Sequence, residues 1–233
     1  MCKLRRKLLL FDYIIGKLIE WQAYLKYGGL GGDVAFTNLS AYQINECLTT
    51  FSGVRLMKML YLICLKSVGD EIKNIDETLF GVFDNYIAMP KGPVEDSAYS
   101  NRSVLLRYEF YNGVLKLSET YPEHFIFNYP DINKTDFNTD DIHKTHIFNL
   151  EMKNPANNGA GEIPLTTYKK LIDQSVAELR EMGNLPFENV NKLIDITHKL
   201  PLWNRFFNTE DRRFVLVLED LHEEKNCFQA LMN

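Results

Sequence analysis

The chain lacks most of the features that accompany a chemical reaction. It has 4 cysteines among 233 residues, and no two of them have the Cys-x-x-Cys spacing that is typical of zinc sites and redox pairs. No GxSxG, HExxH or cysteine–histidine nucleophile pattern stands out. We therefore expect no enzyme activity and no cofactor, and this absence favours a binding protein.

The sequence also lacks a long apolar run and an excess of positive charge. No stretch approaches the roughly 20 apolar residues needed to cross a bilayer, and the net charge of −5 argues against broad contact with nucleic acid phosphates. The apolar run Leu8–Phe11 resembles a signal peptide, but Asp12 interrupts it and no cleavage site follows. Since the cysteine usage suits a reducing compartment, the expected location is the cytoplasm. One basic cluster is interpreted as a solvated helix start: Lys3, Arg5, Arg6 and Lys7.

Three local patterns invite a ligand-binding interpretation. The histidines His143 and His146 lie beside two carboxylates, but Lys144 separates them and no further ligand is evident, so we expect no metal site. The glycine-rich segment 28–33 follows a helix and lacks a phosphate-loop ending, so it is interpreted as a helix cap and connector. His198 is interpreted as a cation at a helix C-terminus. A hydrolase that uses His198 or the 140–146 cluster remains an alternative hypothesis.

Apolar periodicity predicts a mainly α fold: a single helical domain with a buried central helix and a small β hairpin or sheet insertion. The central helix is predicted at 54–67, because its residues are apolar nearly all round. Aromatic runs predict the β element within 125–152. Other helices are predicted at 5–27, at 40–48 with Ser40 as cap, weakly at 94–118, from Pro164 to Gly183, and from Pro186 to before Pro201, with a further one capped by Asp76.

No linker divides the chain convincingly, so one domain is expected over residues 1–233. Its parts are a helical extension, a core of motif helices, an irregular or β insertion and the C-terminal helices, at 1–53, 54–118, 121–163 and 164–233 respectively.

Three short segments carry a resemblance to a known family. The run Leu56-Met57-Lys58-Met59-Leu60-Tyr61 is similar to a buried "KLLYF"-like helix, and Gly92-Pro93-Val94 is similar to a "GPV" turn that opens the next helix. Later, 197–203 contains a His…Trp element that ends at Trp203. In this order they resemble the Panacea-domain (SocA-type) antitoxin family. Pro90-Lys91 stands where many members have an aromatic pair, which puts a contact of that pair in doubt here.

The resemblance implies a helical antitoxin that neutralises a toxin, encoded nearby, by direct protein–protein binding. On this basis we expect the turn and the aromatic-rich segment 121–148 to contact the toxin, because irregular segments on a rigid scaffold vary without cost to the fold. The expected contact residues are Tyr86, Lys91, Gly92, Pro93 and Phe148. The expected structural residues are Leu56, Lys58, Leu60, Tyr61 and Trp203. The turn could equally serve only to connect two helices, and Phe148 could only cover the helical core.

Two alternative functions remain open at this point. A minority of the family is related to a proteolytic adaptor that delivers the toxin to a protease. A DNA-binding autoregulator would need a basic recognition helix, and residues 164–198 offer the one plausible helix pair. In that segment Lys169, Lys170 and Arg180 are offset by Asp173, Glu178 and Glu181, which argues against direct reading of DNA.

Overall fold

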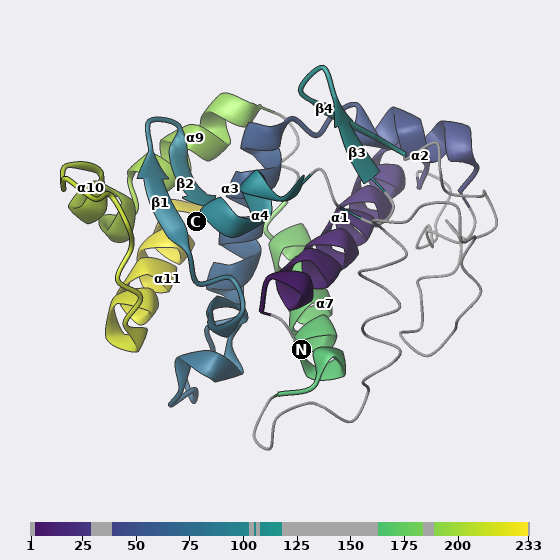
Figure 1. The fold of residues 1–233 in the computed structure, drawn as a ribbon. Coiled ribbons are helices and arrows are strands. Elements are labelled where there is room, and N and C mark those ends of the chain that lie inside the picture. The colour runs from purple at the N-terminus through teal and green to yellow at the C-terminus, as the bar shows by residue number, and fades with distance from the viewer. Residues whose placement is uncertain are drawn as a thin grey trace. The chain divides into compact units, whose positions relative to one another are not determined.

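The computed structural model describes residues 3–28, 39–102, 105, 108–117, 163–183 and 189–232. These residues are mainly helical, which confirms the predicted fold class. Figure 1 shows the helices and strands by label. The described residues group into two compact units. One unit is drawn from 1–52 and 101–164, and the other from 53–100 and 165–233. The prediction of a single domain stays a prediction, and the β element expected within 125–152 lies outside the described residues. None of the described helices is long and apolar enough to cross a membrane.

The first unit is built on two helices predicted from the sequence. Helix α1 spans Lys3–Tyr27, and α2 spans Ala41–Leu48. Ser40 caps α2 through a capping box with Gln43, whose side chain bonds the Ser40 amide in return. The interpretation of the basic cluster as a solvated helix start is wrong in part, because Arg6 and Lys7 are only 9% and 3% exposed.

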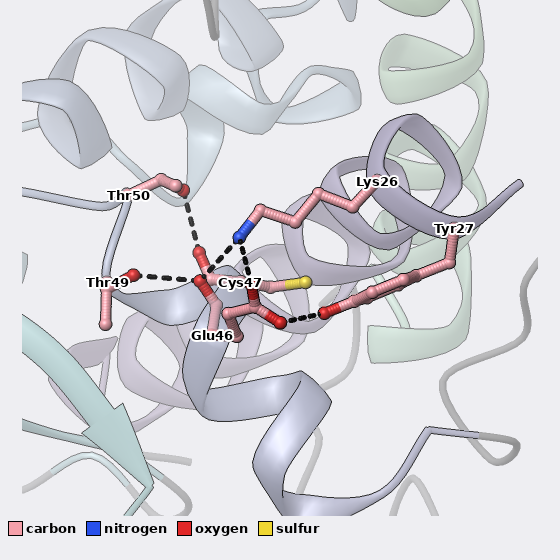
Figure 2. A network of polar contacts seen from close by, with 6 residues as sticks. All are labelled: Lys26, Tyr27, Glu46, Cys47, Thr49 and Thr50. Atoms are coloured by element: carbon pink, nitrogen blue, oxygen red, sulfur yellow. Dashed lines mark hydrogen bonds and ion pairs between the residues drawn. The ribbon is translucent and has the colours of Figure 1, made fainter.

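A polar network at the C-terminal end of α2 joins α2 to the end of α1 (Figure 2). Tyr27 donates its hydroxyl hydrogen to the Glu46 carboxylate, and Lys26 Nζ donates to the Glu46 backbone carbonyl at 3.0 Å. The bond from Tyr27 lowers the pKa of the Glu46 carboxyl. Thr49 and Thr50 bond the carbonyls of Glu46 and Cys47. These bonds satisfy carbonyls that the end of a helix leaves without partners.

The weak helix predicted over residues 94–118 is wrong in its C-terminal half, where a β hairpin forms; a short helix, α4 (Asp96–Ser100), lies near its start. Strands β3 (Tyr108–Tyr111) and β4 (Val114–Leu117) pair antiparallel. The residues between them, Asn112 and Gly113, have φ of 50° and 81°, the backbone of a tight turn that matches the twist of a hairpin. The helix prediction rested on four apolar residues at helical spacing: Val104, Tyr108, Tyr111 and Leu115. It overlooked the Asn-Gly pair, which is the stronger local signal because this pair favours a hairpin turn.

The central helix of the second unit is α3, Gly53–Lys66, as predicted. Every residue from Leu56 to Lys66 is buried. Five elements pack around it: β2 (Gly92–Glu95), α7 (Leu165–Glu181), α9 (Val190–His198), α11 (Leu218–Met232) and a short 3-10 turn at Leu79–Gly81. The helix predicted after Asp76 is wrong: Asn74 and Thr78 instead cap two 3-10 turns, Ile75–Glu77 and Leu79–Gly81.

The "GPV" segment forms a strand and does not open a helix, which corrects the prediction. Strand β1 (Tyr86–Met89) pairs antiparallel with β2 (Gly92–Glu95), and α4 begins only at Asp96. Pro93 fits this strand because it faces Ala88, whose amide instead donates to the Arg212 carbonyl at 2.8 Å. Phe214 donates to the Tyr86 carbonyl at 2.9 Å, so residues 212–214 lie along the other edge of β1 as a second, short partner.

Four helices complete the second unit. They are α7 (Leu165–Glu181), α9 (Val190–His198), α10 (Pro201–Phe207) and α11 (Leu218–Met232), the last in yellow in Figure 1. The first two were predicted with nearly these bounds. Gly183 follows α7 with φ of 101°, a left-handed conformation that is common just after a helix.

Candidate functional site

Lys58 lies on α3 in the core of the second unit and is 1% exposed. Its Nζ donates a 2.7 Å hydrogen bond to the carbonyl of Pro93 in β2. Burial lowers the pKa of the amine to about 7, since a charged ammonium loses its hydration in the interior. The described structure thus holds a lysine whose charged form is strongly disfavoured by burial.

Gly92, at the end of the β1–β2 turn, lies close against side chains of α3 and α9. A Cβ added at Gly92 would lie 2.5 Å from Thr197 Oγ1 and 2.8 Å from Lys58 Cε. The backbone φ of 97° is also in the region that favours glycine. Thr197 is fully buried, and its hydroxyl donates to the Ile194 carbonyl at 3.0 Å, so it has little freedom to move away. Only glycine fits here.

Trp203 of α10 holds the other side of the turn. Its indole Nε1 donates to the Met89 carbonyl at 2.9 Å. Its ring stacks on His198 at a centroid distance of 4.0 Å and on Phe207 at 4.5 Å. We call the set Lys58, Gly92, Pro93, Thr197, His198 and Trp203 the hairpin site.

His198 does not behave as the helix-terminal cation that we expected. Burial lowers its pKa, and the positive charge of Lys58 lowers it further, while the Pro90 carbonyl and Asp195 act in the opposite direction. The neutral ring is therefore favoured at neutral pH, and it stacks on Trp203 as an aromatic side chain.

A second buried network lies one turn further along α3. The hydroxyl of Tyr61 donates to Glu224 Oε1 at 2.5 Å, and the amide of Leu202 donates to Glu224 Oε2 at 2.8 Å. The N-cap of α10, Leu200, has no capping side chain, so Glu224 of α11 supplies the acceptor that this helix start requires. Glu224 is fully buried, and burial outweighs its two hydrogen bonds and raises its pKa to about 7.

The expected structural residues all lie in the second unit. Leu56, Leu60 and Tyr61 are fully buried, and Trp203 is 8% exposed. The tyrosine ring packs edge-on against the rings of Phe80, Tyr86 and Phe214.

The expected toxin-contact residues differ in their exposure. Lys91 is exposed at the tip of the turn, whereas Gly92 and Pro93 are buried. Tyr86 is 1% exposed, and its hydroxyl bonds Cys64 Sγ at 3.4 Å, so its ring lies in the core rather than on the surface. Phe148 lies outside the described residues. Their role in toxin contact stays a prediction.

Sequence reasoning missed Thr197 and Glu224 as members of these networks. Glu224 lies three residues after Leu221 and four before Phe228, both buried. A carboxylate on the apolar stripe of a helix is a signal that the sequence does contain, because buried carboxylates require partners.

Comparison with known proteins gives no evidence on function. No family model, no curated protein and no solved structure matches the chain. Within the described ranges no group of three His, Cys, Asp or Glu side chains could hold a metal ion, and the 140–146 cluster lies outside them.

Proposed function

We propose that this protein is an antitoxin that neutralises a toxin, encoded nearby, by direct protein–protein binding. The proposal includes a cytoplasmic location, which the free thiols of Cys47, Cys64 and Cys227 support. It involves no catalysis by this chain.

The observation that carries the proposal is the convergence of the three motif segments. Residues 56–61, 92–94 and 197–203 are far apart in the sequence. Their members Lys58, Gly92 and Thr197 nevertheless meet within van der Waals or hydrogen-bonding distance. A resemblance that arose by chance from short matches would have no reason to select residues that form one site, so this convergence favours a shared family architecture.

The proposal assigns partner contact to the exposed tip of the turn. Met89, Pro90 and Lys91 are exposed there, on a backbone that Trp203 and Lys58 hold from beneath. A rigid support with an exposed apolar and charged tip suits a binding surface, because little conformational entropy is lost on association. Tyr86 then acts through the core that positions the tip.

The test is growth rescue combined with co-purification. The product of the adjacent gene is expressed under an inducible promoter, alone or together with this chain, and complex formation is followed by pull-down. Lys91→Glu should weaken both rescue and binding without changing the melting temperature. Lys199→Glu, at another exposed lysine of the same unit, is the matched control and should rescue like the wild type. If the wild type neither rescues growth nor binds the neighbouring product, the proposed function is wrong.

A further inference from the structure

The chain between α10 and α11 forms an open edge of the sheet that contains β1 and β2. Arg213 lies opposite Ile87 of β1, while residues 212 and 214 on either side make the hydrogen bonds to β1. In this antiparallel pattern the amide and carbonyl of Arg213 point away from β1, and they have no backbone partner among the described residues. We call residues 213–217 the edge segment.

The edge segment is apolar and lacks the usual protection of a strand edge. Val215 and Val217 are 62% and 43% exposed, whereas Phe214 is 7% exposed. The amides of the two valines bond no other group in the described part of the chain. Natural proteins protect such an edge with a proline, a charged side chain or a covering element, and residues 214–217 include neither a proline nor a charge. This edge is therefore suited to pairing with another extended strand.

The charges at the two ends of the edge segment are opposite in sign. Arg213 stands at its start, with a half-exposed side chain, and Glu219 is exposed just beyond its end, in the first turn of α11. Arg213 bonds Asn85 and lies 3.4 Å from Asp211, but a guanidinium has further N–H donors to offer. When two such strands pair antiparallel, each basic end meets an acidic end, whereas a parallel pair would oppose arginine to arginine. The order of charges thus favours a second copy of this chain as the partner.

We propose that two copies of the chain pair antiparallel through their edge segments, about a two-fold axis at Val215. This register opposes Val215 to its own copy and Arg213 to Val217, and the outward amides and carbonyls of these residues bond across the pair. Glu219 of the second copy then lies diagonal to Arg213, within reach of a long side chain. The inference does not depend on the proposed function, because it concerns copies of this chain alone.

The two neighbouring registers fit the structure less well. An axis at Phe214 would need Arg212 within the strand, and its φ of 53° is not extended. An axis at Leu216 would carry the pairing into α11, which begins at Leu218. Because a short edge buries less area than a standard interface, the expected dissociation constant lies between about 1 μM and about 1 mM.

Sedimentation equilibrium of the full chain, from about 5 μM to about 500 μM, measures this association. The mass of the wild type should rise with concentration towards that of a dimer. Val215→Pro removes an outward amide and no bond to β1, and an edge tolerates proline. This variant should keep the melting temperature and raise the dissociation constant at least tenfold. Leu231→Ala is the control, since Leu231 is a 37% exposed residue of α11 outside the edge segment, and it should dimerise like the wild type.

Charge reversal tests the register itself. Arg213→Glu and Glu219→Arg each place like charges at both ends of the pair, so each should weaken the dimer. The double variant restores opposite charges across the axis and should dimerise more tightly than either single variant. The melting temperature of each variant shows whether it is folded, because Arg213 and Glu219 also have roles within their own chain.

Three results would overturn the proposal. One is a wild type that stays monomeric at the highest concentration. Another is a folded Val215→Pro that dimerises like the wild type. The third is a double charge variant that dimerises no more tightly than the two single variants. If Val215→Pro does not fold, the wild type and the charge variants decide.

Discussion

The amine of Lys58 donates a hydrogen bond to the carbonyl of Pro93, 35 residues further along the chain. This bond ties the middle of the central helix to the first residues of β2. An extended Pro93 allows this bond. Ala88, which lies opposite Pro93, directs its amide to Arg212 and away from β2, so the Pro93 carbonyl also points away from β1 and can accept from Lys58 of α3. The relationship leads to predictions about Gly92 and about Lys58 itself.

Replacing Gly92 with alanine should destabilise the second unit. The positive φ alone costs roughly 1–3 kcal/mol for a residue with a side chain. The new Cβ would in addition lie 2.5 Å from Thr197 Oγ1. The free energy of unfolding should therefore fall by more than it does when alanine replaces a glycine that has only a positive φ. Gly183→Ala is the matched control, because Gly183 has φ of 101° and, among the described residues, nothing lies within 4 Å of an added Cβ. Urea unfolding of both variants provides the comparison, and equal losses would mean that the close approach at Gly92 has no energetic weight.

The stability of the protein should rise with pH above neutrality because of Lys58. Its folded-state pKa is about 7 against an ordinary value of 10.5. Between these values the unfolded state binds more protons than the folded state, so the free energy of unfolding increases as pH rises. The increase is at most about 1.4 kcal/mol per pH unit.

Chemical unfolding from about pH 7 to about pH 9.5, below the ordinary titration of tyrosine, measures this slope. Lys58→Met should remove most of it, and Lys73→Met, at an exposed position, should retain it. A wild-type profile that is parallel to that of Lys58→Met would show that the amine does not titrate in this range.

Glu224 should produce the opposite trend at lower pH. Burial raises its folded-state pKa from 4.5 to about 7, so the folded state binds the extra proton in this window and stability falls as pH rises through it. Glu224→Gln cannot ionise and should remove the fall. Since its amide can still bond Tyr61 and Leu202, the variant should fold.

The measurement is the melting temperature at several pH values between about 4.5 and about 7. Tyr61→Phe serves as a control that removes one partner but keeps the carboxylate, and its melting temperature should still fall with pH. If the Glu224→Gln profile falls as steeply as that of the wild type, the carboxylate is not the group responsible.

The sequence predicts five of the helices well, and it predicts the hairpins poorly. The five helices are α1, α2, α3, α7 and α9. Helix α3 is predictable because apolar residues surround it, and α7 and α9 because their buried residues recur at helical spacing. Strand β2 was predicted as a helix start because proline is also common in the first turn of a helix. The contacts of Pro93 with Lys58 and Ala88, which are distant in sequence or on another strand, are what distinguish a strand from a helix start here.

The hairpin site could be predicted only as separate pieces. Lys58, Gly92 and Trp203 stood out through the resemblance, but the sequence gives no measure of their mutual distances. Nor does it reveal that Lys58 has a single carbonyl acceptor in the described structure, or that Glu224 caps a helix across the fold. Both are tertiary contacts with no local signature, since each joins residues from different elements.

Replacing Leu60 with aspartate should unfold the second unit. Leu60 is fully buried in the middle of α3, where an unpaired carboxylate would cost several kcal/mol, against a total stability of roughly 5–15 kcal/mol for a typical domain. Circular dichroism and thermal melting measure the effect. Leu231→Asp is the matched control, because Leu231 is 37% exposed near the end of α11, and it should melt within a few degrees of the wild type. A Leu60→Asp protein that melts cooperatively near the wild-type temperature would mean that α3 is not the core on which the hairpin site rests.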